Sequence, residues 1–301
     1  MNNSGKKKTE EPKRKSAFKA KTLDFLKEFG IVFGAFLILN NFVIASFLVP
    51  TGSMENEVMA GDLLFVNKFI YGGTSPRNIP FTNVRLPWFR VPAIRDVERG
   101  DVIVFVFPGY RDEVTPEDFT FYLKRCVALA GDTLQVINRV LYVNRKPSPL
   151  PRNLLFTYQR IEPAGQIDER IFPKGAPWNE DNYGPLVIPK KGMVIHLTPG
   201  NIEAWDTFIR REGHKVAVRG GQIEIDGKTA TDYTVRRDYL FGMGDHRDNS
   251  LDSRYWGFIP KEDLVGSPLI VYWSWDTDIP IYNIFAKLGS VRWNRIGTLI
   301  R

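Results

Sequence analysis

The sequence predicts a mostly β fold behind an N-terminal membrane helix. Gly-Asp turn pairs recur at residues 61–62, 100–101 and 131–132, and each precedes a run rich in β-branched and aromatic residues. The 25 glycines and 20 prolines among 301 residues suit a body with many turns. The single long apolar run, residues 29–49, contains 16 apolar residues among 21 and no charge.

The net charge of +7 is concentrated at the N-terminus. Residues 1–21 hold eight basic and two acidic residues, so the other 280 residues are close to neutral. A basic arm that binds nucleic acid is one interpretation of such a tail. The apolar run that follows it favours another, a basic cytoplasmic tail over residues 1–25, with no nucleic-acid partner.

Residues 26–48 are predicted to form a transmembrane anchor, because a helix needs about 20 apolar residues to cross the hydrocarbon core. Asn40 and Asn41 are costly in lipid, so we expect the crossing to end near them and residues 42–49 to continue as an interfacial or strand-like segment. The lysines before the run predict a cytoplasmic N-terminus. The alternatives are a buried core helix and a cleavable signal peptide, although "FLVPTGSM" lacks a small-x-small cleavage site.

The exported part is predicted to begin with strands in residues 61–70, 99–107 and 122–144. Residues 71–95 are predicted to form a long loop that carries prolines and aromatics. We expect this loop to pack either against the lipid interface or against the protein's own surface. We assign residues 49–144 to the first part of the main domain and residues 145–232 to an inserted second domain with an Asp-Gly hairpin. Residues 233–301 complete the main domain and form a C-terminal edge.

The cysteine and histidine residues argue against a disulfide, a cysteine nucleophile and a metal site. The single cysteine, Cys126, has no partner for an intramolecular disulfide, and it lies in an apolar strand where a core residue is expected rather than a nucleophile. The three histidines, His196, His214 and His246, have no spacing typical of a metal-binding helix, and there is no CxxC motif. We predict no metal and no other cofactor.

Ser53 lies just after the apolar run, in "LVPTGSMENEV", and a serine nucleophile needs a base. His246, beside Asp245 and Asp248, is one candidate base, but neighbours on one loop rarely orient each other as a triad requires. Lys124 is another, because burial among apolar residues lowers the pKa of a lysine toward neutrality.

Strand alternation decides where Lys124 points. In "FTFYLKRCVALA" the side chains of Tyr122, Lys124 and Cys126 share one face, so Lys124 and Arg125 point in opposite directions and one of them faces inward. The alternative is that both reach water at a strand end.

Five blocks, "PTGSM", "GDLLFVNK", "RGDVIVF", "YLKRCVALAGD" and "GDHRDNSLDSRYWGFIP", follow one another in an order and spacing that resemble the type I signal peptidases, or leader peptidases. They cover most of residues 47–143 and 239–266. The resemblance implies a signal-peptidase-like β catalytic domain from residues 49–144 and 233–301, an inserted β-rich cap domain and an N-terminal transmembrane helix. It also implies a membrane-bound Ser/Lys endopeptidase that cuts signal peptides from exported preproteins through an acyl-enzyme.

The resemblance assigns roles to single residues. Ser53 is implied to be the nucleophile, Lys124 the general base and Ser250 the hydroxyl that orients the lysine amine. The hydroxyl of Thr51 and the backbone N–H of Ser53 are implied to form the oxyanion hole. Four residues are implied to support the Ser250 loop structurally: Asp245, Arg247, Asp252 and Arg254. The alternative for each of them is a simple turn-stabilising role.

The implied substrate pockets are shallow and apolar and accept the small side chains of an Ala-x-Ala signal. The alternative for several of their residues is a simple role in the core. The residues implied to line the pockets are Phe47, Val49, Pro50, Met54, Val58, Leu64, Tyr122 and Leu123. The implied location is the bacterial inner membrane, with one crossing and the catalytic domain on the outer face. Asn56 and Glu57 replace the family's Pro and Thr, and His246 replaces its Asn. A non-catalytic membrane-tethered binding module and a His-based hydrolase are the competing hypotheses.

Overall fold

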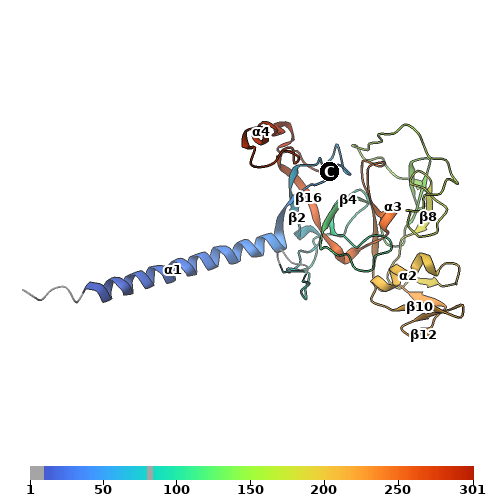
Figure 1. Ribbon diagram of the computed structural model, residues 1–301, viewed down its shortest axis with the longest axis horizontal. Helices are drawn as coiled ribbons and strands as arrows, with labels where there is room; N and C mark the ends of the chain where they lie inside the picture. The colour runs from blue at the N-terminus through green and yellow to red at the C-terminus, as the bar shows by residue number, and fades with distance from the viewer. Residues whose placement is uncertain (1–9, 80–83) are drawn as a thin grey trace, which may run out of the picture.

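The structure of the protein is a computed structural model that describes residues 10–79 and 84–301. It is mostly β, as predicted. A seven-stranded sheet has the order β1 (Ile44–Leu48), β2 (Asp62–Asn67), β16 (Leu264–Ser274), β3 (Val102–Val106), β4 (Phe121–Ala128), β14 (Tyr239–Met243), β15 (Ile259–Pro260). All its pairings are antiparallel. The sheet therefore joins strands from both ends of the chain, as Figure 1 shows.

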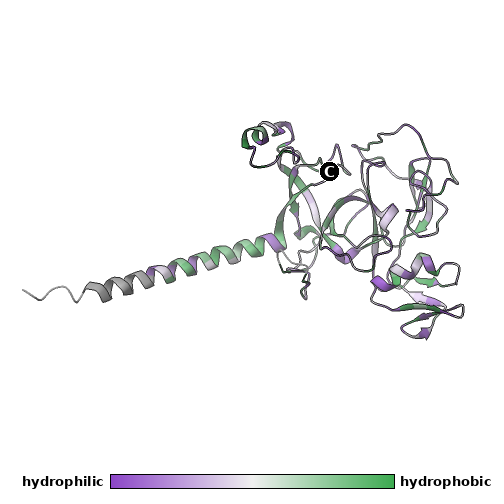
Figure 2. Ribbon diagram, in the orientation of Figure 1, coloured by the Kyte–Doolittle hydropathy of each residue, from purple (hydrophilic) through white to green (hydrophobic). Residues whose placement is uncertain are grey.

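A helical segment precedes this sheet and projects from the body (Figure 1). It comprises α1 (Glu10–Ile38) and a short π-helix, η1 (Leu39–Val43). Figure 2 shows a largely hydrophobic surface along its second half. Its apolar side chains are exposed, with Val32 at 69% and Ile38 at 61%. In the described part of the chain, however, no helix combines the length and the apolarity that a membrane crossing requires.

The structure divides residues 26–48, which were predicted as one anchor, between a helix and a strand. The α-helix ends at Ile38, and the last five residues of the predicted anchor are strand β1, paired with β2 from Ile44↔Asn67 to Leu48↔Leu63. The side-chain amide of Asn41 donates to the carbonyl of Leu37 at 2.8 Å, where the helix changes to the π form. The expectation of a strand-like segment after the two asparagines is confirmed.

The strands expected from the Gly-Asp turns are present. Strands β2 and β3 follow the first two turns, and β5 (Thr133–Ile137) follows the third. Strands β4 and β6 (Val140–Val143) complete the strands predicted over residues 122–144. All five residues of β3 are buried, because it lies between β16 and β4 and is covered on both faces. Its uninterrupted apolar sequence, "VIVFV", suits that central position.

The long loop after β2 packs on the protein itself. The guanidinium of Arg77 lies 3.8 Å from the ring centre of Trp88, and the ring of Phe89 lies 5.8 Å from that of Phe42. Phe42 belongs to η1, so this loop contacts the base of the N-terminal helix.

Three smaller sheets are formed by strands between residues 133 and 234. Their orders are β7 (Lys146–Pro147), β6, β5, β8 (Tyr183–Val187); β10 (Val216–Arg219), β11 (Gln222–Ile225), β12 (Lys228–Thr229); and β13 (Asp232–Thr234), β9 (Val194–His196). The predicted Asp-Gly hairpin joins β11 to β12, with Asp226 at φ 52° and Gly227 at φ 78°. The four-stranded sheet crosses the predicted domain boundary at residue 144, so the proposed division remains a prediction.

The shorter helices are α2 (Ile202–Arg211), α3 (Ser253–Trp256), α4 (Ile284–Gly289) and the 3₁₀ turns η2 (Phe69–Tyr71), η3 (Lys261–Asp263) and η4 (Trp293–Arg295). Buried apolar residues form three clusters, two of which flank the seven-stranded sheet. Cys126 is fully buried in one of these, and burial raises the pKa of its thiol, as expected of a core residue. Strand β4 runs between the clusters and carries the predicted base.

Candidate active site

Ser53 lies on a tight turn between β1 and β2. The turn is closed at its base, because Val49 and Asp62 are hydrogen-bonded through their backbones at 2.9 Å. A single helical turn follows Ser53, in which the Val58 N–H donates to the Met54 carbonyl at 2.8 Å. Met54 and Val58 are fully buried and fix this turn in the core, so the hydroxyl of Ser53 is held at a defined place with 8% of the residue exposed.

Lys124 lies on β4, between Ile103 of β3 and the end of β14, where Met243 pairs with Arg125. The neighbouring strand leaves room for its side chain by means of Gly242. A Cβ atom at Gly242 would lie 3.1 Å from the Cβ of Lys124 and 3.0 Å from the Cδ1 of Ile259. Lys124 is only 4% exposed and points into the protein, whereas strand alternation predicts only that one of Lys124 and Arg125 faces inward.

Ser53 and Lys124 meet, although 71 residues separate them. The Nζ atom of Lys124 lies 2.7 Å from the Oγ atom of Ser53 and also donates to the Leu123 carbonyl at 3.1 Å. The pKa of Lys124 is lowered to about 8, mainly by burial. The negative charge of Asp252 opposes this shift and the positive charge of Arg254 adds to it. A lysine with such a pKa supplies a neutral amine near pH 8, the form that accepts a proton.

Arg125, the next residue, is buried as well, so the alternative in which both side chains reach water is wrong. Its guanidinium donates to both carboxylate oxygens of Asp245, with the closest contact at 2.5 Å, and to the carbonyls of Gly100 and Arg301. The two basic side chains thus have different environments: Arg125 is paired with a carboxylate, whereas Lys124 has a hydroxyl and a carbonyl as neighbours.

Ser250 lies close to Ser53, and its role in orienting the lysine amine stays a prediction. Its buried Oγ atom has no hydrogen-bond partner among the described residues, and the Leu123 carbonyl takes the second contact of the Lys124 amine. Gly244 makes the approach of Ser250 possible: a Cβ there would lie 2.2 Å from the Ser250 Oγ and 2.5 Å from the Ser53 carbonyl oxygen. The glycines at 242 and 244 each admit one site residue, and their alternate spacing in "FGMG" is the signal that sequence reasoning missed.

The predicted oxyanion donors lie on the Ser53 turn. Thr51 is exposed, two residues before Ser53. Within the described chain, no protein group accepts a hydrogen bond from the backbone N–H of Ser53. This N–H is therefore free to donate to another acceptor.

The four predicted support residues are all buried around the Ser250 loop. Asp252 and Arg254 form a direct pair, with Nη2 to Oδ2 and Nε to Oδ1 both at 2.9 Å. Burial would raise the pKa of Asp252, but Arg254 and backbone N–H donors, including that of Gly244, bring this pKa below its usual value. Asp245 and Arg247 do not pair with each other.

Apolar side chains border the dyad on one side. One cluster contains six of the eight residues predicted for the substrate pockets: Phe47, Val49, Met54, Val58, Leu64 and Leu123. Pro50 is exposed, and Tyr122 belongs to another cluster, where its ring stacks on that of Phe107 at 4.2 Å.

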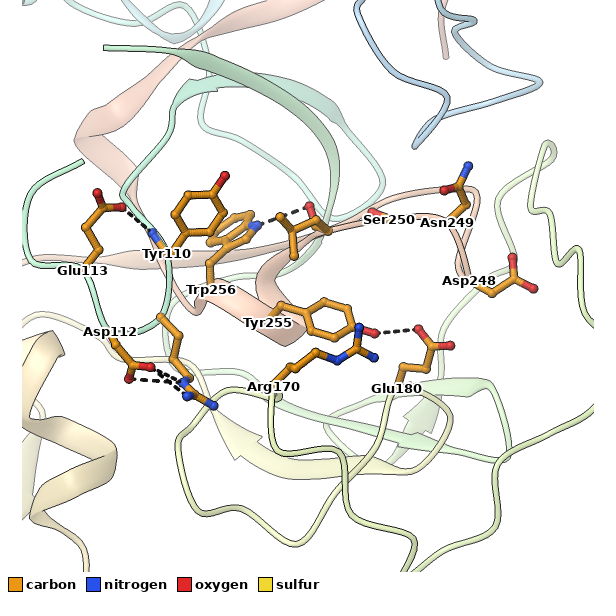
Figure 3. Close-up of a pocket in the computed structure, with 12 residues that line it drawn as sticks. Tyr110, Asp112, Glu113, Arg170, Glu180, Asp248, Asn249, Ser250, Tyr255 and Trp256 are labelled. Carbon is orange, nitrogen blue, oxygen red and sulfur yellow. Dashed lines mark hydrogen bonds and ion pairs between the residues drawn. The ribbon is translucent and has the colours of Figure 1, made fainter. Parts of the chain in front are cut away.

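A cavity of about 650 Å³ opens beside the Ser250 loop. Its walls are formed by residues 110–113, Arg170, Glu180, residues 248–251, Tyr255 and Trp256, and Figure 3 shows these side chains. The Tyr255 hydroxyl donates to Glu180 across this wall at 2.8 Å. Burial raises the pKa of Glu180. Ser250 lines the cavity, while Ser53 and Lys124 do not.

His246 belongs to the same loop but contacts other groups than Ser53 Oγ. Its Nε2 atom lies 2.6 Å from the hydroxyl of Thr157, and its Nδ1 atom lies 3.1 Å from a Glu55 oxygen without hydrogen-bonding geometry. Only its backbone reaches the nucleophile, since its N–H donates to the Ser53 carbonyl at 3.2 Å.

We therefore expect His246→Ala to retain most of the peptide-cleaving activity. The imidazole contacts other side chains and does not reach the hydroxyl of Ser53. Loss of a true general base would lower the rate about 10²- to 10⁴-fold, so a small effect is expected here. The measurement is kcat/KM for a cleaved peptide, with His246→Asn as the size-matched companion. A loss beyond tenfold in both variants would favour the His-based alternative.

Comparisons with known proteins agree on one family. The family model for signal peptidase, peptidase S26, matches residues 22–273. A signal peptidase I from Helicobacter pylori is 26% identical over 276 residues, which is 86% of this chain and 87% of the relative. A signal peptidase I from Pseudomonas aeruginosa is 30% identical over 286 residues, 89% of this chain and 79% of the relative. A crystal structure of a signal peptidase I from Enterococcus faecalis aligns with 58% of this chain and 98% of its own at 19% identity, with a TM-score of 0.29.

Proposed function

The chain belongs to the signal peptidase family, peptidase S26, and on that premise we propose that Ser53 and Lys124 are the dyad with which this serine endopeptidase cleaves signal peptides. The observation that carries the proposal is the 2.7 Å contact between Lys124 Nζ and Ser53 Oγ, inside a buried site where the lysine pKa is about 8. Few surface lysines meet both conditions, since an exposed amine stays fully protonated at neutral pH.

In the proposed reaction the neutral amine of Lys124 takes the proton from Ser53 as its oxygen attacks the scissile carbonyl. The protonated amine then gives its proton to the leaving amine of the mature chain, and an acyl-enzyme remains on Ser53. The same amine, neutral again, activates the water that releases the signal peptide. One buried base thus serves both halves of the reaction.

The oxyanion that develops in both halves needs donors, and we assign them to the Ser53 N–H and the Thr51 hydroxyl. The free N–H of Ser53 supports the first assignment, and each such donor typically contributes a factor of about 10² to 10³ to kcat. Ser250 remains our candidate for orienting the lysine. Its buried, unpartnered hydroxyl beside the Ser53 turn supports that role.

We propose that the substrate is the small-residue end of a signal peptide, of the Ala-x-Ala type. The apolar cluster beside the dyad supports this proposal, because it lies between the Ser53 turn and strand β4. Short apolar walls bind small side chains and exclude large ones, which is a steric form of specificity.

We further propose that the protein is held at the lipid bilayer by its N-terminal helical segment. The exposed apolar side chains along α1, among them Phe29, Ile31 and Val32, support this assignment. A second exposed group lies around α4, with Phe285 87% and Trp293 70% exposed, and α4 lies toward the same side of the body as α1 in Figure 1. A cytoplasmic N-terminus, a single crossing and an outer-face catalytic domain remain predictions.

The test is cleavage of a purified preprotein by the full chain in detergent, with the new N-terminus of the product sequenced. The wild type is expected to cut after a small-x-small segment, and Ser53→Ala to yield no such product, because no oxygen nucleophile remains at the dyad. Ser46→Ala, seven residues earlier on β1, is the matched control and should cut normally. An unchanged product pattern with Ser53→Ala would reject the dyad and leave the binding-module hypothesis.

A further inference from the structure

Glu57 is a buried carboxylate on the helical turn that follows Ser53. It lies four residues after the nucleophile, and its backbone N–H donates to the Met54 carbonyl at 3.1 Å. Only 6% of the residue is exposed. A buried carboxylate is unfavourable unless donors surround it, so its partners reveal what holds it there.

The partners of Glu57 come from three distant parts of the chain. The backbone N–H of Arg301 donates to Oε1 at 2.6 Å, and the side-chain amide of Asn153 donates to Oε2. The guanidinium of Arg125 lies 3.9 Å from Oε2. The Ser53 turn is thereby tied to the C-terminal segment, to the predicted insertion and to strand β4.

The C-terminal segment, residues 292–301, also holds the rest of the same loop. Arg295 donates to the carbonyl of Glu57 at 3.0 Å and to the carboxylate of Asp62, which is fully buried. Arg292 donates to the carbonyl of Ala60 at 2.5 Å. Three residues of one segment thus reach the loop between the nucleophile and the start of β2.

The other end of the cluster is Arg125, the residue next to Lys124. Its guanidinium donates to the carbonyl of Arg301 at 3.0 Å, while Arg301 binds Glu57 through its N–H. A continuous path therefore runs from the turn of Ser53, through Glu57, Arg301 and Arg125, to the strand of Lys124. Every link in it is a hydrogen bond.

We propose that Glu57 is a positioning residue for the reaction: with residues 292–301 and Arg125 it fixes the Ser53 turn against the Lys124 strand. The proposal rests on the Ser53–Lys124 dyad of the proposed function. The dyad is joined by one contact of 2.7 Å, and small displacements of reacting groups cost large factors in rate. Loss of Glu57 loosens the turn and admits water to the amine, whose pKa then moves back toward its ordinary value.

The test is the pH dependence of kcat for Glu57→Gln, measured with the full chain in detergent and a saturating preprotein substrate. Glutamine keeps the size of the side chain and removes its charge. We expect kcat to fall about 10- to 100-fold with KM little changed. We also expect the rising limb of the pH profile, which reports the neutral fraction of Lys124, to move to higher pH by about half a unit or more.

Glu212→Gln is the matched control, because Glu212 is an equally buried carboxylate whose donors, Tyr233 and Tyr239, lie outside the Ser53 turn. Glu212→Gln should keep the rising limb of the pH profile at its wild-type position once the rates are corrected for the fraction of folded protein. If Glu57→Gln does not fold, Glu57→Asp, which keeps the charge and withdraws it by one methylene, is measured in the same way.

A folded Glu57 variant with the wild-type limb and kcat would overturn the positioning role and leave Glu57 as a purely structural residue. The proposed function has a separate test in the same assay. If Ser53→Ala cleaves normally, the dyad itself is rejected, whereas an inactive Ser53→Ala beside an unshifted Glu57→Gln rejects only the positioning role.

Discussion

Lys124→Met is expected to abolish cleavage, with kcat reduced about 10⁴-fold or more, because the site then contains no other group placed to take the proton of Ser53. Methionine approximates the length of the lysine stem and fills the same buried space without an amine. The measurement is single-turnover cleavage of a preprotein by the wild type and the variant at pH 8 to 9. Residual activity within tenfold of the wild type would contradict the role of Lys124.

The same substitution is expected to stabilise the fold at neutral pH. Lys124 is buried, and its pKa is about 8 in the folded chain against 10.5 for the free side chain. Below pH 8 the folded state therefore carries a buried charge, at a cost of about 3 kcal/mol. Between pH 8 and 10.5 the unfolded chain binds more protons than the folded one, so this cost is relieved as the pH rises.

Urea unfolding of the full chain in detergent, at pH 7 and near pH 10, measures this effect. Lys124→Met should be more stable than the wild type at pH 7, and the difference should shrink toward pH 10. Lys287→Met is the matched control. Lys287 is 5% exposed, as against 4% for Lys124, but it donates to the carbonyls of Asp276 and Ile279 away from the dyad. Its replacement should lower stability and leave cleavage intact.

Asp252→Ala is expected to destabilise the fold by about 3–5 kcal/mol, because it leaves the guanidinium of Arg254 buried without its partner. Asp252 is fully buried, caps the first turn of α3 through the Arg254 N–H, and accepts a hydrogen bond from the Gly244 N–H. Cleavage should fall with stability, since Gly244 and Ser250 border the Ser53 turn.

The measurement is the free energy of unfolding of Asp252→Ala in urea, with Asp168→Asn as the control. Asp168 is also paired with an arginine, Arg170, at 2.7 Å, but the Arg170 side chain is 77% exposed. Loss of such a surface pair costs about 1 kcal/mol or less. Equal small losses in both variants would show that the buried pair contributes no more than a solvated one.

Local patterns were enough to predict most of the strands and to make Lys124 a candidate base. Gly-Asp turns followed by β-branched runs identify β2, β3 and β5, because turn residues and pleated, buried strands impose residue types over a few positions. The alternation along β4 predicts that Lys124 and Arg125 point in opposite directions, since side chains of a strand change face at every residue. Resemblance to a family supplied the partner, Ser53.

The end of the N-terminal helix was predicted less well. Residues 44–48 are apolar enough to extend an anchor, yet they pair with β2 and belong to the main sheet. Hydropathy reports only that a residue avoids water, and both a lipid-facing helix and a sheet satisfy that condition. The backbone pairing with β2, which no local pattern encodes, decides between them.

The sequence by itself thus determined that the chain is mostly β, that a base other than histidine was available, and where the candidate nucleophile lies. Only the tertiary structure decided that Lys124 and Arg125 are both buried, that the Leu123 carbonyl accepts a hydrogen bond from the lysine amine, and that Glu57 binds the backbone of Arg301. Periodicity and turn chemistry act over a few residues and can be read along the chain. Burial, the resulting pKa and contacts across 71 or 244 residues arise only when the strands are assembled, because each depends on what the fold places around a side chain.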